Sequence, residues 1–182
     1  MKKVLLVATC LMSTGVSAGE SAHIVGGSLG YGTQDFESKN TNSVSVNAGD
    51  SVSTDLYYRY MLNHYFGVEA GFISGTGGVI SAFTDSIFDV KDLSYQGIRG
   101  VVYGQYPLSQ SNSFYAKVGA SYHEVSYVMD KKNIETKDNG FYGALGWEYR
   151  FKSGVGINAE YQYIPMQELE VQSYNLGISY RF

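Results

Sequence analysis

The sequence is short of several residue types that many soluble domains depend on. Its 182 residues include one cysteine, two prolines and one tryptophan. Charged residues make up 16%, below the roughly 25% of an average globular domain. The cysteine is Cys10, so the chain beyond it has no thiol chemistry and no disulfide framework. A lipid anchor on Cys10 is disfavoured, because Val7-Ala8-Thr9 is a poor acylation context.

The first residues have the pattern of a cleaved export signal. Two lysines precede a short apolar segment, 4–12, and small residues lead up to Ala18. This pattern predicts cleavage between Ala18 and Gly19, giving a signal peptide, 1–18, and a mature part, 19–182. The apolar segment is too short for a membrane anchor, which needs about 20 residues, and no later run reaches about 18.

Charge and composition narrow the classes of partner. Loss of the signal removes two lysines and no acid, so the formal charge falls from −4 to −6. A nucleic-acid partner is not expected, because phosphate binding requires a basic face.

Glycine and aromatic residues are abundant, with 22 Gly, 17 Tyr and 9 Phe. This combination is typical of sheet-rich proteins with tight bends.

The C-terminal segment alternates like a β-strand with one apolar face. Tyr174, Leu176, Ile178, Tyr180 and Phe182 share one face, and the residues between them are small or polar. Successive side chains of a strand point to opposite faces. The same period predicts eight strands, near 22–34, 51–62, 65–74, 92–106, 114–128, 139–151, 155–164 and 170–182. Most are about as long as a tilted membrane strand, which needs about 9–11 residues.

The predicted connections alternate in length. Those near 63–64, 107–113 and 152–154 are short. Those at 35–50, 75–91 and 129–138 are longer and polar, whereas the one at 165–169 is brief. Short turns at one end and long loops at the other are typical of outer-membrane barrels. We therefore predict an all-β fold, an eight-stranded antiparallel up-and-down transmembrane β-barrel with both termini in the periplasm.

Charged residues in the predicted strands fall on the face opposite the apolar one. They are Arg59, Glu69, Arg99, Lys117, Glu148, Arg150, Glu160 and Arg181. Eight strands enclose an interior just wide enough for side chains, so charges there must pair or be solvated. We predict an internal network of salt bridges and hydrogen bonds that plugs the barrel. A filled interior leaves no room for a substrate, so catalytic roles for these acids are disfavoured.

Aromatic residues cluster near the predicted strand ends, mainly on the apolar face. Examples are Tyr60, Phe66, Tyr106, Phe114 and Phe151 near the short turns, and Tyr122, Phe141, Tyr161 and Tyr174 nearer the long loops. Rings at both heights are typical of the aromatic girdles at membrane interfaces. Ordinary strand propensity is the alternative explanation.

Several segments resemble the eight-stranded outer-membrane barrels of the OmpA/OmpX type, including the opacity-like surface antigens. Residues 96–108 with 114–119 resemble a central hairpin of the OmpA transmembrane domain, and 146–151 with 159–163 resemble a later one. The resemblance covers essentially the whole mature chain and implies that Glu69, Lys117 and Glu148 point into the lumen. The periplasmic peptidoglycan-binding domain of OmpA has no counterpart here, so a cell-wall tether is not implied.

The last residues resemble the signal read by the barrel assembly machinery, which has a final aromatic preceded by alternating apolar residues. Leu176, Ile178, Tyr180 and Phe182 match it. The resemblance implies the bacterial outer membrane as the location. It also implies outer-membrane lipid, lipopolysaccharide, the assembly machinery and host surface ligands as partners.

Patterns for catalysis or metal binding are missing from the sequence. His23, His64 and His123 are separated in the predicted topology and lack metal-ligand spacing. His123 and Ser126 are three residues apart, so on a strand they point to opposite faces. No phosphate-binding loop of the G-x-x-x-x-G-K-[ST] form occurs. We expect no cofactor, no metal and no catalytic residues.

We therefore expect a non-enzymatic outer-membrane surface protein that serves envelope integrity, adhesion or host interaction. Its contact residues are expected in the loops, at Asp35–Asp50, Gly75–Val90 and Asp130–Asn139. The alternatives are a small porin-like pore lined by Arg99 and Lys117, a lipid A-modifying barrel enzyme and a soluble secreted β-sandwich. Bilayer conductance, lipid A mass spectrometry and gel mobility before and after boiling would distinguish them.

Overall fold

The chain folds into one closed antiparallel β-barrel. The structure, a computed structural model, describes residues 22–38, 44–77, 91–129, 132–166 and 169–182. Its eight strands are β1 (His23–Ser38), β2 (Val44–Met61), β3 (Phe66–Gly77), β4 (Lys91–Pro107), β5 (Asn112–Met129), β6 (Lys132–Arg150), β7 (Val155–Pro165) and β8 (Leu169–Arg181). They follow one another around the barrel in chain order, and β8 pairs with β1. The predicted eight-stranded up-and-down barrel is confirmed.

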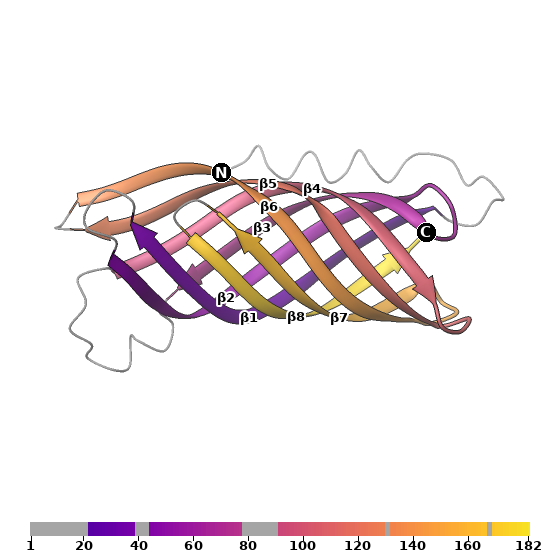
Figure 1. Cartoon of the computed structure of the whole chain (residues 1–182). Helices are drawn as coiled ribbons and strands as arrows, with labels where there is room; N and C mark the ends of the chain where they lie inside the picture. The colour runs from indigo at the N-terminus through magenta and orange to yellow at the C-terminus, as the bar shows by residue number, and fades with distance from the viewer. Residues whose placement is uncertain (1–21, 39–43, 78–90, 130–131, 167–168) are drawn as a thin grey trace, which may run out of the picture.

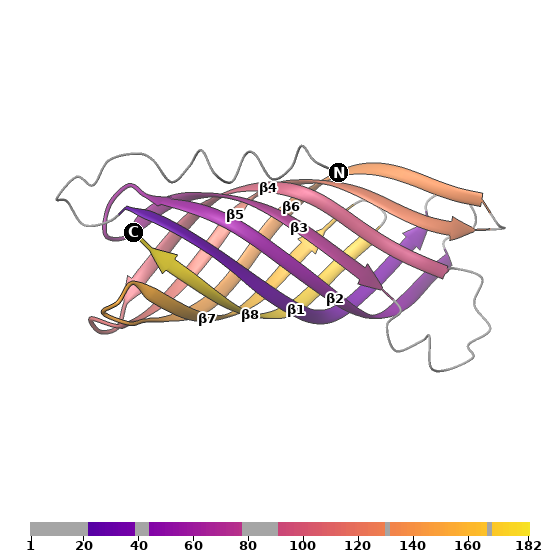
Figure 2. The same cartoon turned by 180° about the vertical axis from the view of Figure 1, so that it is seen from behind.

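Both described ends of the chain lie at the same end of the barrel. Val25 pairs with Tyr180 across the β1–β8 seam, and the amide of Phe182 donates to the carbonyl oxygen of His23 at 2.9 Å. The three short connections lie at this end too, on the right in Figure 1 and on the left in Figure 2. They are residues 62–65, 108–111 and 151–154. We call this the turn end, and the opposite end the hairpin end.

At the hairpin end, two connections are shorter than the sequence predicted. β1 and β2 continue until Ser38 pairs with Val44, so most of 35–50 is strand. β6 begins at Lys132, so most of the predicted loop at 129–138 is also strand. Both loop predictions were wrong, because backbone pairing continues beyond the length that a membrane requires. Figure 1 shows the β5–β6 hairpin extending past the rest of the barrel.

Two other predictions fall outside the described residues. The cleavage site between Ala18 and Gly19 lies within residues 1–21, and most of the predicted loop at 75–91 lies within 78–90. In the described part of the chain, no helix is long and apolar enough to cross a membrane.

The short turns contain the residues that their geometry requires. The side-chain oxygen of Asn63 accepts hydrogen bonds from the amides of Tyr65 and Phe66, both at 2.8 Å, which closes the β2–β3 turn. Gly154 in the β6–β7 turn has a φ of 90°, a backbone conformation that favours glycine. Its carbonyl oxygen accepts a hydrogen bond from the Arg181 amide at 3.0 Å, so this turn is joined to the end of β8.

Large aromatic rings inside the barrel lie over glycines on the neighbouring strand. The cross-strand pairs are Tyr57 with Gly26, Tyr95 with Gly75 and Tyr115 with Gly146. A Cβ atom added to any of these glycines would overlap the tyrosine ring. The glycines therefore provide the space in which the rings fill the interior, and this dense packing keeps the ionic side chains in place.

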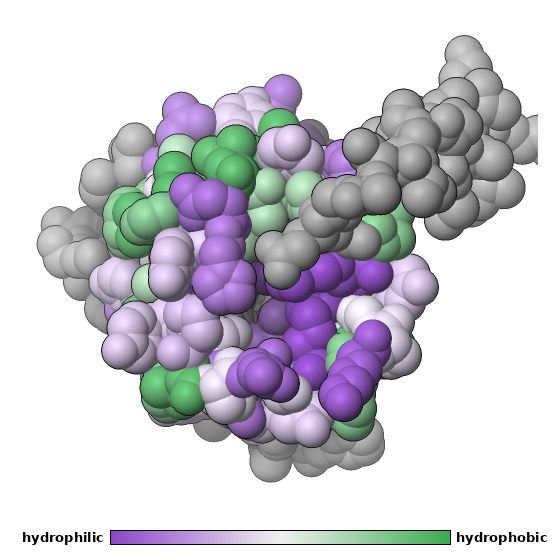
Figure 3. Space-filling view, turned by 90° about the vertical axis from the view of Figure 1, so that its right-hand side faces the viewer, coloured by the Kyte–Doolittle hydropathy of each residue, from purple (hydrophilic) through white to green (hydrophobic). Residues whose placement is uncertain are grey.

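The outer wall is apolar around the barrel. Exposed outward residues of every strand contribute to it, among them Leu29, Leu56, Val68, Val102, Val118, Leu145, Ile157 and Leu176. Viewed from the turn end, hydrophilic residues gather in the middle of the ring and hydrophobic residues lie towards its periphery (Figure 3). This is the reverse of a soluble sandwich, whose apolar side chains face inward.

Candidate functional site

Glu69 on β3 is the centre of a charge network inside the barrel. Its carboxylate oxygens contact Arg59 at 2.7 Å, Arg99 at 2.6 Å and Lys117 at 3.1 Å. These three cations come from β2, β4 and β5, so one acid joins four strands. Moving an ion out of water costs several kcal/mol, so each of these buried groups depends on its partners.

Two further carboxylates extend the network across the lumen. One oxygen of Asp55 accepts two hydrogen bonds from Arg99, at 2.8 and 3.0 Å. Glu160 on β7 contacts the ammonium of Lys117 at 2.7 Å. Because Arg99 and Lys117 both also contact Glu69, the ion pairs form a continuous chain from β2 to β7 and not a set of separate pairs.

Towards the turn end, Glu148 on β6 connects two arginines. It contacts Arg150 at 2.7 Å and Arg59 at 3.6 Å. The whole network thus joins four carboxylates to four cations, and their formal charges cancel. Arg181 is half-buried at the end of β8, beside Ile24 in the register, and belongs to none of these seven contacts.

Buried tyrosines fill the space between the ion pairs. The guanidinium carbon of Arg59 lies 3.6 Å from the centre of the Tyr103 ring. Arg99 lies 4.7 Å from the centre of the Tyr142 ring, whose hydroxyl donates to Glu160 at 3.2 Å. The face of an aromatic ring attracts a cation, most strongly where water is excluded. The rings therefore stabilise the cations and close the gaps around them.

Sequence alternation placed eight charges on the inner face, and seven of them belong to the seven ion pairs of this network. The missed member is Asp55, although it lies four residues before Arg59 and so shares its face. The role of the inner tyrosines was also missed. Alternation assigns a ring to the inner face, but it does not show which cation the ring covers.

The histidines do not form a site with one another. Among the described residues, no group of three or more His, Cys, Asp or Glu could hold a metal ion. His23 bonds the Tyr58 hydroxyl at 2.6 Å at the turn end, and His64 is exposed in the β2–β3 turn. His123 is buried under the hairpin end, where it pairs in register with Asp138.

The predicted assembly residues Leu176, Ile178, Tyr180 and Phe182 lie on the outer wall, as their alternation requires. All four are exposed, and the Phe182 ring stacks against both Tyr180 and His23. The predicted girdle residues also face outward, with Tyr106 and Phe114 at the turn end and Phe141 and Tyr174 towards the hairpin end.

A charge placed on the outer wall is expected to destabilise the barrel according to its depth. Leu145 is 65% exposed and lies on β6 halfway between the outward rings of Phe141 and Tyr149. Leu145→Arg should lower the free energy of unfolding by about 2–4 kcal/mol, and Tyr106→Arg at the turn end by no more than about 1 kcal/mol. Urea titration in phospholipid vesicles measures both, and equal losses would contradict the proposed depth of Leu145.

Comparison with known proteins agrees with this geometry. Residues 4–182 match the family model of the outer membrane protein beta-barrel domain. The chain belongs to this family. The attachment invasion locus protein of Yersinia enterocolitica is 27% identical in an alignment of 188 residues that covers 100% of each chain. As a member of this outer-membrane family, the protein spans the bacterial outer membrane, so the soluble-sandwich alternative is wrong.

Two solved structures show how widely the fold is shared. Neisserial surface protein A superposes with a TM-score of 0.68 at 13% identity and covers 90% of this chain and 99% of its own. Ail, the attachment invasion locus protein of Yersinia pestis, was solved in complex with the heparin analogue sucrose octasulfate. It superposes with a TM-score of 0.57 at 18% identity and covers 88% of this chain and 99% of its own. At these identities, both structures support the fold alone.

Proposed function

We propose that this outer-membrane barrel is a non-enzymatic attachment protein, which binds a host surface ligand through its hairpin end. The observation that carries the proposal is the full-length relationship to the attachment invasion locus protein of Yersinia enterocolitica. An alignment that spans both chains completely includes the hairpins as well as the membrane strands. If the alignment covered only the membrane strands, it would support the barrel fold and not the attachment function.

The filled interior supports a function outside the barrel. Arg59 is 1% exposed, and Glu69 and Lys117 are each 3% exposed, although they lie in the middle of the lumen. A water-filled pore would expose such charges to solvent, as the wide lumens of porins do. The packing thus favours a closed scaffold over the pore, because the charged side chains of the network are almost completely buried.

The charge at the hairpin end indicates the chemistry of the ligand. Residues 33–50, 76–94, 124–139 and 164–172 belong to this end in the strand order, and they contain 12 acids and 5 lysines, a net charge of −7. Since complementary charge steers association and like charge opposes it, we propose a ligand with a basic surface. A sulfated polysaccharide, similar to the heparin analogue in the Yersinia pestis complex, would be repelled on average.

Hairpin truncation tests the attachment function. The register allows an Asn-Gly turn to replace 34–49, 77–93 and 127–134 without shifting the flanking pairs. Bacteria that display the triple truncation should adhere to cultured epithelial cells no better than bacteria without the protein. Adhesion by the intact protein should weaken as salt is added, because salt screens surface charges.

The matched control is Lys152→Gln in a turn at the other end, which should leave adhesion unchanged. Slower gel mobility after boiling would show that every variant still forms the barrel. Adhesion that survives in a folded triple truncation would contradict the proposal. Adhesion that soluble heparin blocks and salt does not weaken would refute the basic ligand while leaving the attachment function in place.

Two assignments from the sequence belong to the same proposal. Residues 1–18 would direct export and be removed before Gly19. The outward residues Leu176, Ile178, Tyr180 and Phe182 would be read by the barrel assembly machinery before the seam closes, and their exposure on one face of β8 supports this. Lipopolysaccharide would surround the hairpin half of the wall.

A further inference from the structure

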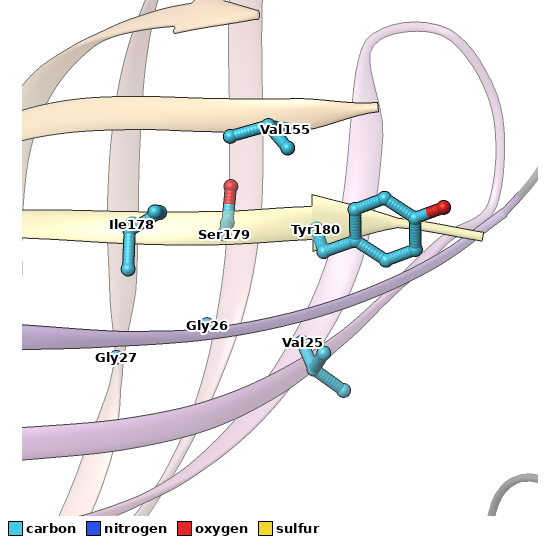
Figure 4. Close-up of a pocket in the computed structure, with 7 residues that line it drawn as sticks. All are labelled: Val25, Gly26, Gly27, Val155, Ile178, Ser179 and Tyr180. Carbon is cyan, nitrogen blue, oxygen red and sulfur yellow. The ribbon is translucent and has the colours of Figure 1, made fainter. Parts of the chain in front are cut away.

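A groove lies on the outer wall where β7, β8 and β1 meet. It encloses about 360 Å³ and is lined by Val25, Gly26, Gly27, Val155, Ile178, Ser179 and Tyr180 (Figure 4). Its volume is at the lower end of the range for sites that hold small molecules. The groove crosses the seam that closes the barrel, in the half of the wall nearer the turn end.

Gly27 lies at the bottom of this groove, and the end of the Leu56 side chain approaches it from β2. Gly27 lies on the outward face of β1 between Val25 and Leu29, and it pairs in register with Ile178 on β8. The side chains of Val25, Leu29 and Ile178 all project from the wall. The flanking side chains therefore rise on both sides of a position that has only backbone.

The lining of the groove is almost entirely apolar. Ser179 belongs to the inner face of β8, where its hydroxyl accepts a hydrogen bond from Arg150 at 3.2 Å. The polar group at the rim is the phenol of Tyr180, whose hydroxyl points towards the turn end in Figure 4. In the membrane an acyl chain is already in apolar surroundings, so it gains from the groove through van der Waals packing and not through removal from water.

The apolar wall around the groove and the charge of the neighbouring turns indicate which kind of molecule occupies it. The groove continues the apolar wall that contacts lipid in this outer-membrane family, and its position near the turn end places it in the periplasmic leaflet. Just below it, the β6–β7 turn carries the exposed Lys152, three residues before Val155. The described short turns, 62–65, 108–111 and 151–154, contain no acidic residue that would repel a phosphate.

We propose that the groove holds one acyl chain of a glycerophospholipid from the periplasmic leaflet, and that Lys152 contacts the phosphate of its headgroup. The lipid is a resident one that exchanges more slowly than its neighbours, because Val25, Val155 and Ile178 border the groove and give its chain more packing contacts than a flat wall would. A second copy of the barrel fits this groove less well, since a stable protein interface buries more than about 1,000 Å² and seven residues line the groove.

Native mass spectrometry of the barrel extracted from outer membranes in mild detergent tests this proposal. The wild-type barrel should retain one glycerophospholipid. Gly27→Leu fills the bottom of the groove by displacing the end of the Leu56 side chain, which lies 2.9 Å from an added Cβ atom, and should lose the adduct. Gly100→Leu is the control for a leucine added elsewhere on the outer wall, because Gly100 is an exposed residue of β4 with nothing within 4 Å of an added Cβ atom, and it should retain the lipid. Lys152→Gln should retain less lipid than the wild type.

Three results would contradict a lipid in this groove. Absence of an adduct on the wild-type barrel, or equal retention by Gly27→Leu and Gly100→Leu, would overturn the proposal. A dimer that Gly27→Leu abolishes would assign the groove to a second copy. If Gly27→Leu does not fold, Ile178→Phe replaces it with Ile98→Phe as the control, since these isoleucines are 60% and 62% exposed on the outer wall.

Discussion

Replacing Glu69 with alanine is expected to lower the free energy of unfolding by about 3–5 kcal/mol. The substitution leaves Arg59, Arg99 and Lys117 in the lumen without the acid that all three contact. The remaining carboxylates of the network cannot balance the four cations, so one positive charge stays buried without compensation. Equilibrium urea unfolding in phospholipid vesicles measures the loss, with the single tryptophan, Trp147, as the fluorescence reporter.

Glu124→Ala is the control for this substitution. Glu124 lies beyond the charge network, half-buried and opposite the exposed Lys137 in the β5–β6 register, and charges near the surface contribute no more than about 1 kcal/mol. Glu69→Gln should fall between the two, because the amide keeps the shape and one acceptor while it loses the charge. A loss for Glu69→Ala no larger than for Glu124→Ala would show that the network does not hold the strands together.

Replacing Gly119 with alanine is the second change with a large expected effect. An added Cβ atom on Gly119 would overlap the carbonyl oxygen of Gly100 and lie 2.6 Å from Cα of Val101 on β4. Because these neighbours are backbone atoms, β4 and β5 would have to move apart in the middle of the wall. We expect a loss of about 1–3 kcal/mol, as for other overpacked interiors, or no closed barrel.

The adjacent outward glycine provides the comparison for Gly119. An alanine at Gly100 meets nothing within 4 Å, so Gly100→Ala should change stability by no more than about 0.5 kcal/mol. Both variants can be refolded into detergent and scored by gel mobility before urea titration. Equal stability of the two variants would contradict the close approach of β4 and β5 at Gly119.

The face on which each side chain lies could be predicted from the sequence. The alternation along β8 separates Tyr174 and Leu176, which are exposed on the outer wall, from Ser173 and Asn175, which are buried in the lumen. The same reasoning placed Glu69 and Lys117 inside the barrel. Strand ends were less predictable, because residues 35–38 and 44–50 pair across a hairpin that does not need an apolar face.

The identity of each ionic partner could not be predicted from the sequence. Arg59 and Glu69 are direct cross-strand neighbours, but Arg99 reaches Asp55 and Lys117 reaches Glu160 from strands that do not pair with theirs. Such contacts depend on how the strands tilt and stagger when the sheet closes. The stagger is a property of the whole ring, so no single strand encodes it.

An eight-stranded membrane barrel with an apolar wall and a charged interior follows from the alternation along the chain, because a period of two assigns every side chain to one of two faces. The ionic partners in the interior, the close approach at Gly119 and the groove over Gly27 are seen only in the closed barrel. These features arise where residues far apart in the chain meet after closure. Their geometry is fixed by the register of all eight strand pairs together.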